Sequence, residues 1–149
     1  MLRNLLTGLP VMFLCLLLQA SFVTTLLHHY SGLELAEKAR GSQWREILLL
    51  SMVMLLMLLA NLAQMAIWAV LFLLIGEFSD FSTALYHSAV NFVTLGYGDI
   101  VMTDRWRLLG PLEGVNGILM FGVSTAVMTA AVLDVVKQRT ENVRHRERP

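Results

Sequence analysis

The chain has 149 residues, of which 56% are hydrophobic and 15% are charged, and its formal net charge is zero. A soluble domain is usually about 45–50% apolar and about 25% charged, and the apolar surplus here lies in blocks rather than in amphipathic stripes. These features favour a membrane protein of one domain. Cys15 is the single cysteine, which excludes an intrachain disulfide and a cysteine-based metal site.

The first 30 residues contain an uncharged apolar segment, Leu9 to Leu27. Its length is close to the ~20 residues that a helix needs to cross the hydrocarbon core of a bilayer. We therefore expect residues 1–30 to form an N-terminal transmembrane helix. A secretory signal peptide is an alternative, although no small-residue cleavage site follows Leu27. An interfacial helix is another, because Pro10 and Gln19 weaken the segment as a span.

Residues 31–46 form a polar connector. Ser31 to Arg40 has the pattern of a short amphipathic helix, with Gly41 suited to its C-terminal cap and Ser42 to the N-cap of the next helix. We expect this helix to lie on the membrane surface, and a plain connector is the alternative.

Residues 47–136 contain two further long apolar segments with a short one between them. Residues 47–75 carry no charge, and we expect them to form an outer helix. Asn61 and Gln64 lie one turn apart within this helix and are expected to form interhelical hydrogen bonds. We expect residues 108–136 to form an inner helix.

The segment from Phe81 to Val93 is too short and too polar to cross a bilayer. It leads directly into a glycine motif, which indicates a re-entrant half-helix followed by irregular backbone. Such backbone is tolerated at membrane depth only where protein or a water-filled cavity surrounds it.

The glycine motif is Thr94-Leu-Gly-Tyr-Gly-Asp99. Gly96 and Gly98 can adopt positive φ at no steric cost, which lets successive carbonyl oxygens point the same way. Leu95 and Tyr97 would then face away from the carbonyl row, and Thr94 would add a hydroxyl at its inner end. A G-x-G is weak by itself, and its position between two long apolar segments makes it informative.

The basic residues indicate the orientation. Eight of the eleven lie in the 31–46 connector or in the tail of residues 137–149, and three lie on the other side. By the positive-inside rule, the connector and tail are cytoplasmic, and the N-terminus and glycine motif face outward. The basic tail could contact anionic lipids, and a disordered topogenic tail is the alternative.

These motifs resemble the pore module of tetrameric potassium channels, with a pore helix at 81–93, a filter at 94–99 and an inner helix at 108–136. The stretch from Ile118 to Ala126 looks like the inner helix of simple two-span bacterial channels, and the additional first helix suggests a three-span relative. The resemblance implies an all-α, multi-pass protein of the inner (plasma) membrane. It further implies a homotetramer in which rings of filter carbonyls replace the hydration shell of K⁺.

The resemblance also assigns residue roles. The ion sites would be formed by Thr94, Leu95, Gly96, Tyr97 and Gly98. Filter support would come from Asp99, Tyr86, His87, Val90 and Glu113. Tyr86 and His87 stand where paired tryptophans often brace the filter, and Val93 stands where a second threonine is usual. We expect Tyr86 to hydrogen-bond to Asp99 and His87 to pack beside Tyr97, which makes this brace polar.

In the inner helix, Gly117 matches the position where the family often bends on opening. The cavity and gate would be lined by one helical face, formed by Ile118, Phe121, Thr125, Thr129 and Val132. Helix–helix packing is the alternative explanation of this face. Glu113 is either a strut behind the filter, a surface group paired with Arg107, or a proton sensor.

No catalytic set, metal cluster, phosphate loop or charged voltage sensor is evident in the sequence. We therefore expect a channel rather than an enzyme, with K⁺ as the permeant ion and no cofactor. The expected partners are K⁺, membrane lipids and further copies of the chain, without nucleic acid. A weakly selective cation channel and a non-conducting regulatory or scaffold subunit are the alternatives.

Overall fold

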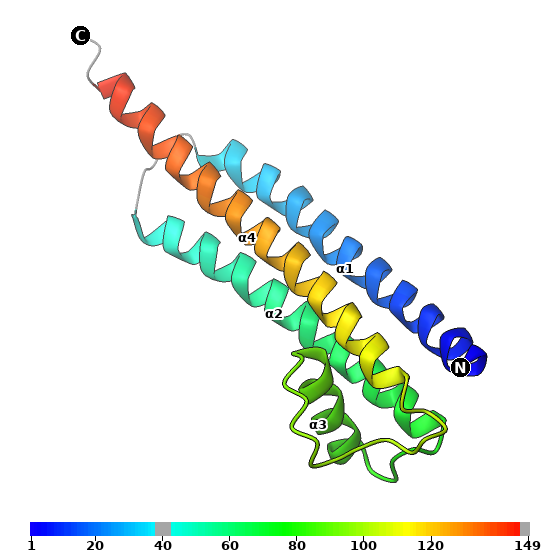
Figure 1. The fold of residues 1–149 in the computed structure, drawn as a ribbon. Helices are drawn as coiled ribbons and strands as arrows, with labels where there is room; N and C mark the ends of the chain where they lie inside the picture. Colours follow the sequence, from blue (N-terminus) through cyan, green and yellow to red (C-terminus); the bar gives the residue numbers. More distant parts are fainter. Residues whose placement is uncertain (38–42, 147–149) are drawn as a thin grey trace.

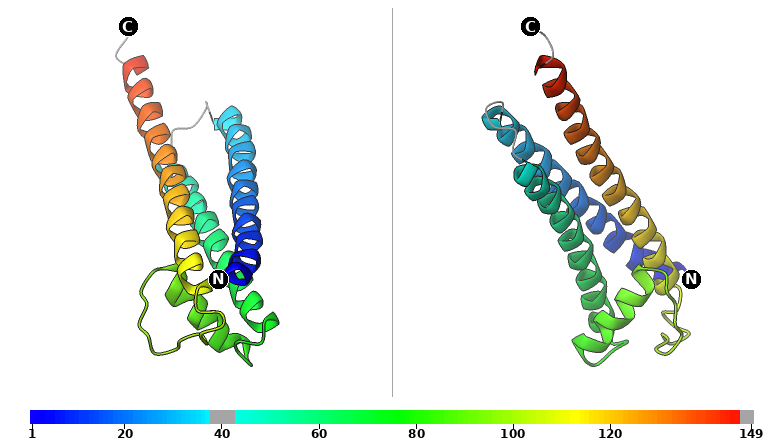
Figure 2. Two further views of the ribbon diagram at one scale, coloured as in Figure 1. Left: turned by 45° about the vertical axis from the view of Figure 1, so that its right-hand side comes forward. Right: turned by 90° about the vertical axis from the view of Figure 1, so that its left-hand side faces the viewer.

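The computed structural model describes residues 1–37 and 43–146, which are all-helical apart from their connecting loops (Figure 1). The helices are α1 (Leu2–Glu37), α2 (Gln43–Leu74), α3 (Phe81–Phe92) and α4 (Leu109–Arg146). The long helices α1, α2 and α4 lie side by side, and the short α3 packs against α2 and α4 at one end (Figures 1 and 2). The N-terminus lies at the α3 end and the C-terminus at the opposite end. The all-α membrane fold expected from the sequence is confirmed.

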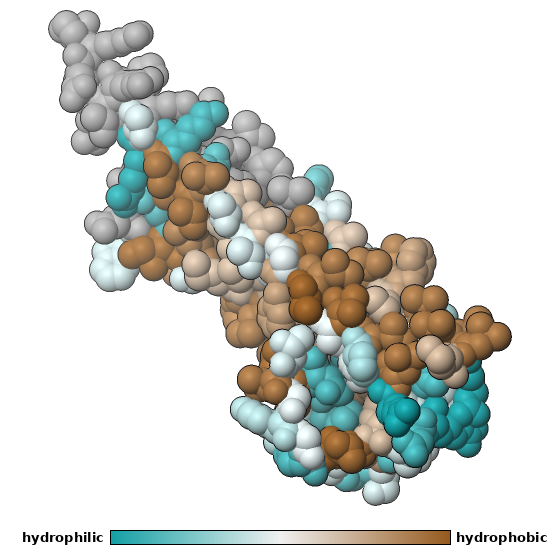
Figure 3. All heavy atoms as spheres, viewed as in Figure 1, coloured by the Kyte–Doolittle hydropathy of each residue, from teal (hydrophilic) through white to brown (hydrophobic). Residues whose placement is uncertain are grey.

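Three helices are long and apolar enough to cross a membrane, over Leu2–Leu26, Glu46–Leu74 and Leu109–Lys137. They correspond to the three predicted spans. On the face shown in Figure 3, hydrophobic residues cover the middle of the molecule and hydrophilic residues gather toward its ends. With 12 residues, α3 is too short to cross a bilayer, as the sequence indicates.

Two helices extend beyond their predicted ends. α1 continues to Glu37, so residues 31–37 do not form the separate short helix that the sequence predicts. The isolated Gly32 lowers helix stability by only about 1 kcal/mol, which is too little to break a long helix. The predicted caps at Gly41 and Ser42 lie outside the described residues. α4 likewise continues to Arg146, because Lys, Gln, Arg and Glu in this polar extension all favour helix.

α2 ends in a Schellman motif. The N–H of Gly76 donates to the carbonyl oxygen of Leu73, and the N–H of Glu77 donates to that of Phe72, both at 3.0 Å. Gly76 adopts a φ of 72°, the left-handed conformation that this cap requires. The cap turns the chain away from the long helices and toward α3.

Buried amides tie the three long helices together near their middle. Gln64 of α2 donates to Gln19 of α1 at 2.8 Å, and Asn61 donates to Ser124 of α4 at 3.3 Å. Gln19 also donates to Ser124 at 3.2 Å. These bonds confirm the expectation that Asn61 and Gln64 join neighbouring helices. Apolar side chains pack on both sides of this network, including those of Trp68, Phe72, Leu109, Met57 and Val53.

Candidate functional site

The short helix α3 is capped so that its C-terminal end points toward the glycine motif. The Asp80 carboxylate accepts the N–H of Thr83 at 2.8 Å, which is the N-cap interaction expected at a helix start. This interaction lowers the pKa of Asp80. A cap at one end and the filter segment at the other fix both the start of α3 and its direction.

The C-terminal end of α3 is a second Schellman motif, with Thr94 in the left-handed position. The N–H of Thr94 donates to the backbone carbonyl oxygen of Asn91, and the N–H of Leu95 donates to that of Val90, both at 2.9 Å. The N–H of Gly96 also donates to the Val90 carbonyl oxygen, at 3.4 Å. Thr94 has a φ of 60°. Glycine usually occupies this position, and a β-branched residue there is strained by about 1–3 kcal/mol.

Left-handed residues alternate along the filter segment. Thr94, Gly96 and Gly98 have φ values of 60°, 56° and 74°. Positive φ at both glycines agrees with the expectation from the sequence, whereas positive φ at Thr94 was not expected. The side chains between them, Leu95 and Tyr97, are 54% and 64% exposed, so a single chain leaves them free for contact with another surface.

The loop that follows the glycine motif is fixed to α3 by a hydrogen bond between two side chains. The hydroxyl of Tyr86 donates to the Asp99 carboxylate at 2.6 Å, as expected from the sequence. This bond lowers the pKa of Asp99 and raises that of Tyr86. It connects the surface of α3 directly to the last residue of the glycine motif.

His87 makes a second attachment, but not in the expected way. Its Nδ1 lies 3.1 Å from the carbonyl oxygen of Ile100, and its Nε2 lies 2.8 Å from Nδ2 of Asn91. These partners select the neutral tautomer with its proton on Nδ1. Nδ1–H donates to the Ile100 carbonyl oxygen, and the unprotonated Nε2 accepts from the Asn91 amide nitrogen. Burial lowers the pKa of His87 in agreement with this assignment.

The aromatic neighbours of His87 differ from the prediction as well. The imidazole packs against Phe72 and Phe78, with ring centroids 5.5 Å and 5.0 Å apart. Among the described residues no such contact joins His87 to Tyr97. Within a single chain the imidazole thus packs against Phe72 of α2 and Phe78 of the following loop rather than beside Tyr97.

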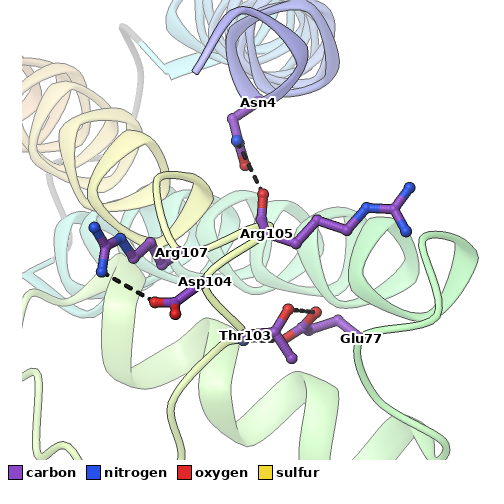
Figure 4. A network of polar contacts seen from close by, with 6 residues as sticks. All are labelled: Asn4, Glu77, Thr103, Asp104, Arg105 and Arg107. Carbon is purple, nitrogen blue, oxygen red and sulfur yellow. Dashed lines mark hydrogen bonds and ion pairs between the residues drawn. The ribbon is translucent and has the colours of Figure 1, made fainter.

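Three further attachments of the loop at residues 99–107 were not foreseen, and Figure 4 shows the first two. Both carboxylate oxygens of Glu77 accept from Thr103, one from its N–H and one from its hydroxyl, the latter at 2.9 Å. Asn4 of α1 donates to the carbonyl oxygen of Arg105 at 3.1 Å. The Arg3 guanidinium lies 4.4 Å from the ring centre of Trp106. Loop 99–107 is thus attached to α1, to α3 and to the end of α2.

Comparison with known proteins identifies the family. Residues 56–134, more than half of the chain, match a family model described as "Ion channel". This segment contains most of α2, all of α3, the glycine motif and the apolar part of α4. The chain belongs to this ion-channel family.

The channel is also similar to the Caenorhabditis elegans protein "TWiK family of potassium channels protein 18". The two are 36% identical over 73 residues, which cover 49% of this chain but only 14% of the worm protein. No solved structure matches the chain significantly. The family match and the three apolar helices together identify a multi-pass membrane protein, and an ion channel rather than an enzyme.

Glu113 of the channel is fully buried behind α3. The Ser88 hydroxyl lies 2.8 Å from the carbonyl oxygen of Met65 and also contacts Oε1 of Glu113. A hydroxyl has one proton, so both bonds form together only when Glu113 is the neutral acid and donates to Ser88. Arg107 pairs instead with Asp104 at 3.0 Å, so the alternative of a surface Glu113 paired with Arg107 is wrong.

Small residues let α4 approach the end of α3. A Cβ at Gly114 would lie 3.4 Å from the carbonyl oxygen of Asn91, and one at Gly117 would lie 1.9 Å from that of Phe92. The expected hinge at Gly117 is thus also a point of close approach between these two helices. Whether α4 bends there stays a prediction.

The side chains expected to line the cavity point away from the protomer's own core. The exposed residues of this face are Ile118, Phe121, Thr125, Thr129 and Val132. Phe121 also packs edge-on against Phe92, with ring centroids 5.6 Å apart. This largely apolar face therefore lies exposed next to the glycine motif, where another protein surface, lipid or a water-filled cavity could adjoin it.

Proposed function

We propose that this channel conducts K⁺ selectively and passively through a pore built from four copies of the chain. The observation that carries the proposal is the run of alternating left-handed residues Thr94, Gly96 and Gly98 directly after α3. Such alternation suits a row of carbonyl oxygens facing one side. Carbonyl rings of this kind replace the hydration shell of K⁺ in channels.

The proposed ion sites follow from that backbone. Carbonyl oxygens of Thr94, Leu95, Gly96 and Tyr97 would contact dehydrated K⁺, with Gly98 completing the row and the Thr94 hydroxyl at its inner end. Strain at Thr94 supports the assignment, because residues held in sparsely populated conformations cluster at functional sites. Val90 contributes as the acceptor that holds the start of the filter.

A homotetramer is proposed because one filter strand cannot surround an ion. The exposure of Leu95 and Tyr97, together with that of Ile118, supports this, since large apolar side chains beside a polar filter need a partner surface. In the tetramer, the face of α4 from Ile118 to Val132 would line the cavity and inner gate.

We further propose that the α3 end of the molecule faces outward and that the C-terminal end of α4 is cytoplasmic. The support is the excess of Lys and Arg near the C-terminus and in the 31–46 connector. The basic residues beyond the third span would then lie close to anionic lipids of the inner leaflet.

The test is ion flux into liposomes that contain the purified channel, comparing K⁺, Rb⁺, Na⁺ and Li⁺. The disruptive variant is Gly96→Ala, because an alanine resists the φ of 56° although nothing lies within 4 Å of its Cβ. Gly76→Ala is the matched control, since Gly76 has a φ of 72° and equally open surroundings outside the filter.

The expected result is uptake of K⁺ and Rb⁺ but not of Na⁺ or Li⁺, lost in Gly96→Ala and kept in Gly76→Ala. Equal Na⁺ uptake by the parent would instead identify a weakly selective cation channel. No uptake by a well-folded protein at several pH values would favour a non-conducting regulatory or scaffold subunit.

A further inference from the structure

A group of fully buried polar side chains lies behind α3, between the three long helices. It comprises Trp68 of α2, Glu113 and Asn116 of α4, and Cys15 of α1, each with no exposed surface. The Cys15 thiol lies near the side chains of all three others, Asn116, Trp68 and Glu113. These four side chains, from three helices, therefore surround one small region.

The polar atoms of this group are largely unsatisfied. Within the part of the chain that the structure describes, Trp68 Nε1, Glu113 Oε2 and both side-chain polar atoms of Asn116 have no hydrogen-bond partner. The nearby Cys15 thiol does not replace a strong hydrogen-bond partner, because sulfur is a weak donor and a weak acceptor. A buried polar group without a partner destabilises the fold, and more so when it is surrounded by hydrocarbon.

These unsatisfied atoms match the hydrogen-bonding capacity of water. Trp68 Nε1–H and the Asn116 amide are donors, whereas Glu113 Oε2 and the Asn116 carbonyl are acceptors. Water donates two hydrogen bonds and accepts two, and buried water typically bridges about three otherwise unpartnered groups. Exchanging the oxygen and nitrogen of Asn116 leaves this balance unchanged, because both atoms lack a partner.

We propose that each protomer binds ordered water in this site, one molecule or more, bridging Trp68, Glu113 and Asn116 behind the filter. The site is separate from the ion pathway, because its side chains point into the protomer while Ile118 and Thr125 face outward. It does not depend on the ion that the pore selects.

Apolar packing closes the site along the membrane normal. Leu109 and Phe72 lie toward the α3 end of the molecule, and Met57 and Val53 lie beyond the amide network toward the other end. Gln64 Oε1 and Asn61 Oδ1 in that network are also unpartnered, so further water can extend inward as far as these atoms. The proposed water therefore lies between two apolar clusters rather than in a passage across the membrane.

The direct test is a density map of the unmodified channel at a resolution that shows ordered water. Density within hydrogen-bonding distance of Trp68 Nε1, Asn116 and Glu113 Oε2 is expected. The proposal would be overturned by a map that shows ordered water elsewhere in the channel but no water density between these side chains, which would then contact one another directly.

A spectroscopic test follows the Trp68 indole N–H. In Trp44→Phe/Trp106→Phe, Trp68 is the single tryptophan, and its ultraviolet resonance Raman spectrum reports whether that N–H is hydrogen-bonded. The N–H is expected to be bonded in this parent and unbonded after Asn116→Leu. Met120→Leu is the control on the next turn of the same buried face and is expected to change nothing.

Two spectroscopic results would contradict the proposal. One is an unbonded Trp68 N–H in the parent. The other is a bonded N–H that survives Asn116→Leu unchanged, since the partner would then be the thiol or another protein group. Should Asn116→Leu fail to fold, the parent spectrum and the density map still decide.

Discussion

Gly117 of α4 lies against the carbonyl oxygen of Phe92, the residue that ends α3, and a Cβ at Gly117 would be 1.9 Å from that oxygen. This contact fixes the distance between α4 and the end of α3, directly before the glycine motif. A side chain at Gly117 must therefore push the two helices apart.

Gly117→Ala is expected to destabilise the channel by about 1–3 kcal/mol, the usual effect of forcing a methyl group into a packed core. The measurement is thermal unfolding of the purified protein in detergent. Gly122→Ala is the control, because a Cβ at Gly122 meets nothing within 4 Å. That variant should keep or raise stability, since alanine favours helix. Equal melting temperatures for the two variants would show that the close contact is not a constraint.

Thr94→Gly is expected to raise stability by about 1 kcal/mol while impairing K⁺ selectivity. Glycine relieves the strain at a φ of 60°, but the variant lacks the hydroxyl proposed for the innermost ion site. Thermal unfolding and liposome flux measure the two effects separately.

Two other variants of Thr94 separate strain from hydroxyl chemistry. Thr94→Ala removes the hydroxyl and keeps a Cβ at positive φ, so it should lose selectivity without the gain in stability. Thr94→Ser should preserve selectivity. Normal selectivity in both Thr94→Gly and Thr94→Ala would remove the hydroxyl from the proposed ion site.

Much of the architecture could be predicted from local sequence signals. Apolar blocks predicted the three spans, and the polar character of 81–93 predicted a short helix that the structure ends at Phe92. Alternate glycines predicted the left-handed positions at Gly96 and Gly98. Thr94 escaped prediction because a β-branched residue is disfavoured at positive φ, so its sequence gives no such indication.

The attachments around the filter could not be predicted because they join distant parts of the chain. Asn4 and the carbonyl of Arg105 are 101 positions apart, and Glu77 and Thr103 are 26 apart. A single polar residue near a helix end is compatible with many partners. The contact between Ser88 and Glu113 is similar: burial of an acid in a span can be anticipated, but its partner depends on how α3 packs.

The stability of the channel is expected to decrease as pH falls below neutrality, through His87. Burial lowers its pKa below the ordinary value of 6.5, so the unfolded chain binds a proton more readily than the folded one. The stabilising neutral form is fully present above pH 6.5 and is lost as pH falls through the lower, folded-state pKa. Glu77 and Asp99 are the charged groups that oppose this shift.

The measurement is the melting temperature of the parent and of His87→Asn between about pH 8 and about pH 5, the range in which histidine titrates. Asparagine can donate to Ile100 but does not titrate. The parent should lose stability more steeply with acid than the variant. Parallel curves would show that protonation of His87 is not coupled to folding.

An ion pair joins the start of α2 to the C-terminal part of α4. Nε of Arg139 donates to the carboxylate of Glu46 at 2.6 Å. The pair is partly exposed, so its contribution to stability is expected to be at most about 1 kcal/mol and to decrease with added salt. Its position matters more than its strength, because movement of the C-terminal part of α4 away from the start of α2 would separate the two residues. Glu46→Gln and Arg139→Gln should each increase K⁺ flux at low salt, and the double variant should add little to either. Additive increases in this double-mutant cycle would show that the two residues act independently and that the pair does not restrain α4.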